Sequence, residues 1–290
     1  MNPILQKASW MESGDIRPYV FVRPENSIAN PGARHQLDWF IHEPIYKNPL
    51  SLDELPFAEH IYDIEGKAFG PSNMAMPRWV FYDCSVVPGF VAGFACRTSK
   101  LPAAFRAILP ERPGCEWTPL SLFIIIPSMH KGEWVAHNLC TINSLVKDKS
   151  DQLYGLGFLS KAFGLWYANV EQCTGFTQWG SPALKLHSHF GYLEVVGAYA
   201  PVHSHAETIT YRANISTACW EKFFTREEDM AFLENYEPTE IMIDPREQKS
   251  MIDLQRKIER HEGPFYLNAS EIAGKDLSEK LTIYRPKKIF

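Results

Sequence analysis

The chain has 290 residues and a net charge of −5, from 34 acidic and 29 basic residues. With 45% hydrophobic and 22% charged residues, its composition is that of a globular protein with one large domain or two ordinary ones. The charge balance excludes a basic surface for nucleic acid, and no apolar run approaches the roughly 20 residues that span a bilayer.

The six cysteines are widely spaced, form no CxxC pair, and follow no secretory signal in residues 1–18. Spacing of this kind is typical of reduced thiols in an intracellular protein. We therefore expect free cysteines, a cytoplasmic location and no membrane association.

The first half of the chain predicts an antiparallel sheet interrupted by short helices. Alternating apolar residues and proline positions indicate strands at 19–22, 79–85, 89–96, 121–126 and 133–146, with hairpins joining the second to the third and the fourth to the fifth. Helical spacing indicates helices at 34–46, 51–69 and 101–109.

A glycine turn, Gln152–Gly157, follows the long strand and opens a helical run at Phe158–Val170. A short strand is predicted next, at Thr174–Trp179. A turn of this kind leaves backbone N–H groups at the positive end of the helix dipole. The sequence therefore predicts a phosphate-binding site at residues 152–158.

The spacing of Gln152, Gly155 and Gly157 resembles the pyrophosphate loop of the GNAT superfamily of N-acetyltransferases. The second GNAT signature is matched at the expected distance by Ala183, Leu186, His187, Gly191 and Tyr192. The resemblance is best over residues 133–214. It implies an α/β fold with a mixed, mostly antiparallel sheet, a V-shaped splay between two parallel central strands, and flanking helices.

The resemblance also suggests how the chain is organised. We expect residues 1–215 to form the acyltransferase domain and residues 216–290 a helical extension packed on it. Capping boxes at Thr225 with Glu228 and at Asp244 with Glu247 predict helix starts in this extension.

As a GNAT-like protein, the chain is expected to use acetyl-CoA or another acyl-CoA as co-substrate. The pyrophosphate would contact the loop backbone, and the pantetheine arm the end of the preceding strand. The residues expected to bind the co-substrate are Leu145, Val146, Gln152, Leu153, Tyr154, Gly155, Leu156, Gly157, Phe158 and Ser181. Ser181 also fits the ordinary start of a helix.

The resemblance leaves the catalytic base open. The family often places a glutamate on the strand before the loop, but residues 140–144 contain no carboxylate. Glu133 and His137 lie on the predicted strand and are the candidate bases, although each also fits a structural role. His187 stands where the family commonly has a tyrosine that protonates the departing thiolate, and it also fits a packing role.

His203 and His205 are expected in a turn between two strands, which borders the acceptor pocket in the family. Together with Glu207 they are also the best metal-binding pattern in the chain. We expect no metal, and keep a metal-dependent enzyme as an alternative.

The predicted function is an acyltransferase that moves an acyl group, by default acetyl, from acyl-CoA to an amine of a small molecule or peptide by direct attack. Two alternatives stay open. One is an enzyme that takes its acyl group from an acyl carrier protein, and the other is a module that binds acyl-CoA without turnover.

Overall fold

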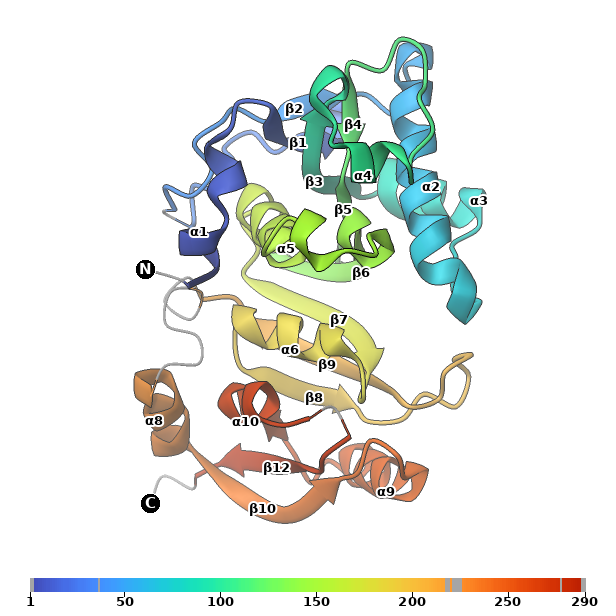
Figure 1. Cartoon of the computed structure of the whole chain (residues 1–290). Coiled ribbons are helices and arrows are strands. Elements are labelled where there is room, and N and C mark those ends of the chain that lie inside the picture. The colour runs from blue at the N-terminus through green and yellow to red at the C-terminus, as the bar shows by residue number, and fades with distance from the viewer. Residues whose placement is uncertain (1–2, 36, 217–219, 221–225, 277, 288–290) are drawn as a thin grey trace. The chain divides into compact units, whose positions relative to one another are not determined.

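The computed structural model describes residues 3–35, 37–216, 220, 226–276 and 278–287. The chain divides into two compact units, residues 3–170 and residues 171–290 together with 1–2. Each unit combines helices with a sheet, so the predicted mixed α/β class is confirmed (Figure 1). Among the described residues, no helix is both long and apolar enough to span a membrane.

The sheet of residues 3–170 has the strand order β6-β5-β3-β1-β2, and β4 pairs with β3. All pairs are antiparallel except β1 with β2, which confirms the mostly antiparallel, mixed sheet. The strands are β1 (Ile16–Phe21), β2 (Ile45–Lys47), β3 (Phe90–Arg97), β4 (Trp117–Pro119), β5 (Ser121–Pro127) and β6 (Glu133–Thr141). The helices are α1 (Pro3–Lys7), α2 (Leu55–Phe69), α3 (Arg78–Phe81), α4 (Ala103–Arg106) and α5 (Leu156–Tyr167).

Helices α2 and α5 cover opposite faces of this sheet. Phe57 of α2 packs its ring against that of Tyr19, with 4.9 Å between centroids. Gly164 of α5 lies against Phe123 and Ala92. Ala92 pairs with Val20, the neighbour of Tyr19, and adjacent residues of a strand point to opposite faces. The sheet is therefore buried on both sides, as its apolar strands require.

The second unit has the strand order β7-β9-β8-β11-β12-β10, and every pair within it is antiparallel. The strands are β7 (Gln172–Gln178), β8 (Leu193–Gly197), β9 (Thr208–Asn214), β10 (Tyr236–Ile243), β11 (Tyr266–Leu267) and β12 (Leu281–Pro286). The helices are α6 (Pro182–His187), α8 (Arg226–Asn235), α9 (Gln248–Glu259) and α10 (Ala269–Gly274).

The prediction that residues 216–290 are helical is wrong in part, because three strands lie there. Strand β11 pairs with β8, so these residues continue the sheet of the second unit. The capping box at Thr225 and Glu228 includes Thr225, which lies outside the described residues. The main segment of the second unit begins at Glu171, so the proposed boundary at residue 215 falls inside this unit.

Two element predictions in the first unit are wrong. Residues 79–85 form α3 and a π-helical turn, Tyr82–Val86, instead of a strand. Phe81 and Ser85, four residues apart, are buried while Trp79 and Tyr82 are exposed, which is the spacing of a helix face.

The described part of 34–46 contains no helix and ends in β2. The apolar residues here are used for packing instead, because the Phe40 ring packs edge-on against Phe163 and in a tilted arrangement against Trp166 of α5. These tertiary contacts satisfy the apolar side chains without a helical backbone.

Candidate functional site

The glycine loop follows a 3-10 turn at Lys149–Asp151 and leads into α5, which begins at Leu156, two residues before the predicted start at Phe158. A second 3-10 turn, Ile142–Leu145, braces it through the Asn143 side chain. Asn143 Oδ1 accepts a hydrogen bond from the Leu153 amide (3.0 Å), and its Nδ2 donates to the Leu153 carbonyl (2.7 Å). Gln152 Nε2 donates to the Asn143 carbonyl (3.0 Å). The loop therefore has a fixed shape before any ligand binds.

The amides of Tyr154, Gly155 and Gly157 have no hydrogen-bond partner among the residues that the structure describes. Gly155 has a φ of +74°, the left-handed conformation that glycine adopts without strain. The Leu159 amide donates to the Gly155 carbonyl, so Gly155 is the N-cap of the twelve-residue helix α5. Unpaired donors at the positive end of a helix dipole favour a phosphate group.

The N-terminal segment packs on this loop, which the sequence did not indicate. Trp10 Nε1 donates a hydrogen bond to the Tyr154 carbonyl (2.9 Å). The Lys7 ammonium lies 5.4 Å from the centre of the Tyr154 ring. The Ile4 side chain lies so close to Gly155 that a Cβ there would be 2.3 Å from Ile4 Cγ2. Steric contact with Ile4 is thus a second reason for glycine at this position.

Leu145 and Val146 do not lie on a strand, and this part of the prediction is wrong. Strand β6 ends at Thr141, because the backbone turns to bring Asn143 under the loop. The Val146 amide donates to the Asn143 carbonyl (3.3 Å), and the Val146 carbonyl accepts from Gln152 (3.4 Å). These backbone groups hold the loop, and contact of either residue with a pantetheine arm stays a prediction.

Strand β6 contains a β-bulge at His137 and Asn138. Phe123 of β5 pairs with Leu139, but Ile125 pairs with Ala136, so two residues of β6 lie opposite Ile124. Side chains alternate between the two faces of the sheet along a strand. His137, next to Ala136, and Asn138, next to Leu139, therefore both lie on the face that α2 covers. Bulges that redirect side chains in this way occur next to active sites.

Through Asn138, the bulge contacts a carboxylate of α2 that the sequence did not single out. Asn138 Nδ2 donates a hydrogen bond to Glu65 Oε1 of α2 (3.2 Å), and the Met76 amide donates to the same oxygen (2.9 Å). Burial lowers the pKa of His137, and a side-chain hydrogen bond with Asn138 opposes this shift. Burial raises the pKa of Glu65, which is only 3% exposed. Sequence spacing could not reveal this group, since Glu65 and Asn138 are 73 positions apart.

Glu133, the other candidate base, lies at the first position of β6 and closes the β5–β6 turn. Ser128 Oγ donates to Glu133 Oε2 (2.9 Å), and the Ser128 amide donates to the Glu133 carbonyl (3.0 Å). With a strand rise of about 3.4 Å per residue, it is roughly 13 Å along the strand from His137. The structure therefore does not bring the two candidates together.

Ser181 and His187 begin and end α6. The Ser181 side chain accepts a hydrogen bond from the Ala183 amide (3.2 Å), so it is the N-cap of this helix. His187 is buried, and its ring lies against that of Tyr211 with 5.1 Å between centroids. Burial raises the pKa of Tyr211 well above its usual value. The roles of Ser181 in co-substrate binding and of His187 as proton donor stay predictions.

His203 and His205 lie in the turn between β8 and β9, as predicted. His203 Nδ1 accepts a hydrogen bond from the His205 amide (3.0 Å), while Glu207 bonds instead to Gln248 of α9. Across the described residues, no group of three or more His, Cys, Asp or Glu side chains could hold a metal ion. Among these residues, His203, His205 and Glu207 are therefore not brought together as a set of metal ligands.

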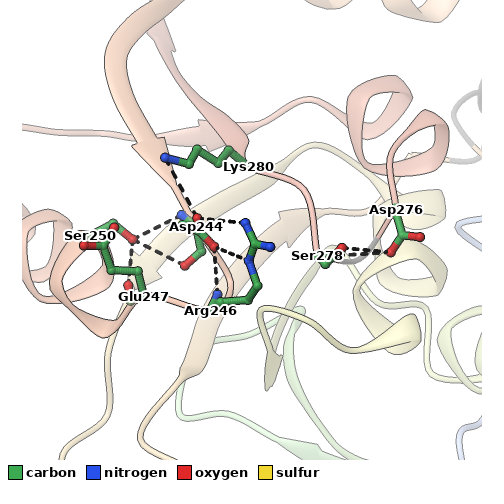
Figure 2. Close-up of polar contacts among 7 residues, drawn as sticks. All are labelled: Asp244, Arg246, Glu247, Ser250, Asp276, Ser278 and Lys280. Atoms are coloured by element: carbon green, nitrogen blue, oxygen red, sulfur yellow. Dashed lines mark hydrogen bonds and ion pairs between the residues drawn. The ribbon is translucent and has the colours of Figure 1, made fainter.

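Figure 2 shows a charged cluster around Asp244, between β10 and α9. Its carboxylate accepts hydrogen bonds from the Arg246 amide (3.0 Å) and from Arg246 Nε (3.1 Å), and Lys280 Nζ lies 3.9 Å away. The hydrogen bonds from Arg246 lower the pKa of Asp244. Ser250 Oγ accepts from the Asp244 amide (3.1 Å). With all these partners supplied by the chain itself, the cluster stabilises the turn before α9.

No family model matches the chain, and no curated protein matches it in sequence. Solved structures do match. The ribosomal-protein-S18-alanine N-acetyltransferase from Escherichia coli has 16% identity and a TM-score of 0.37, over 58% of this chain and 91% of that one. A NatC complex bound to Gag peptide and CoA has 10% identity and a TM-score of 0.38, over 58% and 97%.

A third match, from Lactobacillus plantarum and classed as an N-acetyltransferase, has 11% identity and a TM-score of 0.36, over 55% of this chain and 92% of that one. All three likenesses are distant, with TM-scores below 0.5.

Proposed function

We propose that this protein is an acyltransferase that binds acyl-CoA through the glycine loop and transfers the acyl group to an amine. The observation that carries the proposal is that the amides of Tyr154, Gly155 and Gly157 have no partner in the described part of the chain, in a loop that Asn143 holds in place. Such a set of donors fits the two phosphates of a pyrophosphate group. A preformed loop also loses little entropy when the ligand binds.

The chemistry needs little beyond orientation. The amine nitrogen attacks the thioester carbonyl carbon, the C–S bond breaks, and the thiolate takes up a proton. Holding the two reactants together can supply roughly 7–11 kcal/mol of the barrier. A base for the acceptor amine adds about 10²–10⁴-fold.

Calorimetric titration of CoA into the Gly155→Ala variant tests the loop. An alanine here must adopt a positive φ, at a cost of about 1–2 kcal/mol, and its Cβ meets Ile4. We expect CoA affinity to fall at least tenfold.

Gly114→Ala is the matched control, because Gly114 has a φ of +80° and no atom within 4 Å of the added Cβ. It carries the same backbone strain far from the loop in sequence, and should bind CoA like the wild type. Equal CoA affinity in folded Gly155→Ala protein would contradict the proposal.

The same titration distinguishes acyl-CoA from an acyl carrier protein as the source of the acyl group. If the loop binds pyrophosphate, CoA binds more tightly than 4′-phosphopantetheine, which lacks the nucleotide and one of the two bridging phosphates. Equal affinities would favour an acyl carrier protein as the donor.

A further inference from the structure

Among the residues that the structure describes, Glu65 differs from the other acids of α2 in having no positively charged partner. Glu59 pairs with Arg78 (2.6 Å) and Asp63 with Arg112 (2.7 Å). Within the described part of the chain, Glu65 forms no ion pair, although it is only 3% exposed. The paired acids of the same helix, Glu59 and Asp63, are more exposed than Glu65. The two groups that donate hydrogen bonds to its carboxylate, the Met76 amide and Asn138 Nδ2, are both neutral.

A buried carboxylate without a cation is costly, and chains usually pair or neutralise it. Burial accordingly raises the pKa of Glu65, and the Met76 amide only partly offsets this. A ligand that brings its own positive charge would recover part of that cost. The acceptor of an N-acyltransferase does so, because a primary amine is an ammonium ion at neutral pH.

Building on the proposed function, we infer that Glu65 binds the ammonium group of a cationic primary-amine acceptor and takes its proton. Asn138 is then a positioning residue that aims the carboxylate from the β6 bulge. Strand β6 runs directly into the turn that braces the glycine loop. One continuous segment therefore both orients Glu65 and supports the glycine loop.

The segment between α2 and α3 offers a way in. Met76 covers Glu65 with a single backbone hydrogen bond, and its neighbours Asn73, Ala75 and Pro77 are exposed. The ammonium N–H of the acceptor would replace the Met76 N–H on Oε1. Most residues of this segment face solvent.

The acceptor R–NH3⁺ gives one proton to the Glu65 carboxylate, and the burial that favours the protonated acid also favours the neutral amine. The amine attacks the thioester carbon, the C–S bond breaks, and a second N–H proton goes to the CoA thiolate. The products are the amide, CoA–SH and protonated Glu65, which then releases its proton to water.

Glu65→Gln tests this directly, because it keeps the shape and removes the charge. With acetyl-CoA and a panel of primary amines and peptide N-termini, we expect turnover to fall about 10²–10⁴-fold. The acetyl-CoA dissociation constant should stay within twofold. Glu59→Gln, on the same helix but paired with Arg78, is the control and should keep wild-type turnover.

The outcomes separate this inference from the proposed function. Wild-type protein that fails to bind acetyl-CoA overturns the proposed function. Wild-type protein that binds acetyl-CoA but acetylates no amine of the panel overturns the role of Glu65, as does full turnover in Glu65→Gln.

Asn138→Ala supplies a second readout that does not need Glu65 to be replaced. The titratable groups of the sheet that face α2 here are His137, Cys140 and Tyr19, and burial raises the pKa of Cys140 and of Tyr19 well above their usual values. Helix α2 itself carries the buried His60 as well as Glu65, and burial lowers the pKa of His60 to about 4. Loss of the Asn138 donor raises the pKa of Glu65. The same loss lowers that of His137.

If Glu65 is the base, the acidic limb of the kcat/KM profile therefore moves to higher pH in Asn138→Ala. A limb that moves to lower pH, or does not move, overturns the role of Glu65 and leaves His137 as the base.

Discussion

His60 of α2 is a residue whose environment sets a pH dependence of stability. It is 1% exposed, and neither ring nitrogen has a hydrogen-bond partner in the described structure. Burial, with the nearby Arg112, lowers its pKa to about 4, and Asp63 opposes the shift. In the unfolded chain an imidazole has a pKa of about 6.5.

The folded state therefore keeps His60 neutral where the unfolded state already binds a proton. As pH falls from about 6.5 to about 4, proton binding favours the unfolded state by up to roughly 3 kcal/mol. Above pH 6.5 the group contributes nothing to this dependence. We predict that His60→Leu removes this loss of stability between pH 6.5 and pH 4. The free energy of unfolding at pH 7 should change little.

Urea unfolding of wild-type and variant protein at pH 7, 5.5 and 4 measures this difference. His130→Leu is the control, since His130 is exposed in the β5–β6 turn. If the free energies of unfolding of wild type and His60→Leu differ by the same amount at all three pH values, protonation of His60 does not destabilise the folded state and the prediction is wrong.

The turn at Ile142–Leu145, the glycine loop and the start of α5 form one supporting element. Asn143 holds Leu153 through both its oxygen and its nitrogen. We predict that Asn143→Ala costs about 1–3 kcal/mol, because it leaves the Leu153 amide and carbonyl without their partner. It should also weaken CoA binding, since the unpaired loop amides lose their fixed orientation.

Thermal unfolding and CoA titration measure both effects. Ser144→Ala is the control, because Ser144 is the next residue and bonds only to the Thr141 carbonyl (2.8 Å), outside the loop. A variant Asn143→Ala with unchanged CoA affinity would mean that the loop keeps its shape without this support.

At the scale of the whole chain, the structure changes where a truncation is tolerated. The sequence suggested that residues 216–290 are an extension, but β11 pairs with β8 through Leu267 and Leu193. We predict that a chain ending at residue 215 is largely insoluble, because β8 becomes an open edge strand with exposed apolar side chains.

Soluble yield and near-UV circular dichroism check this prediction. A chain ending at residue 287 is the control, since it loses only residues outside the described structure. A soluble 1–215 chain with native-like dichroism would show that the second unit folds without its last three strands.

The sequence by itself determined the glycine loop, the helix that follows it, and the α/β class. These follow from local patterns: continuous apolar runs in β3 and β5, and two glycines at the start of α5. Local spacing also placed α2, Ser181 as a helix cap, and the turn with His203 and His205.

Only the tertiary structure decided the rest, because the deciding contacts join residues far apart in the chain. Phe81 and Phe40 adopted conformations set by packing on α2 and α5 rather than by their own neighbours. The bulge in β6 exists only relative to β5, and Glu65 became a candidate base only where α2 meets that bulge. Burial of a charge, pairing and steric contact such as Ile4 on Gly155 depend on the folded arrangement, so no local pattern could show them.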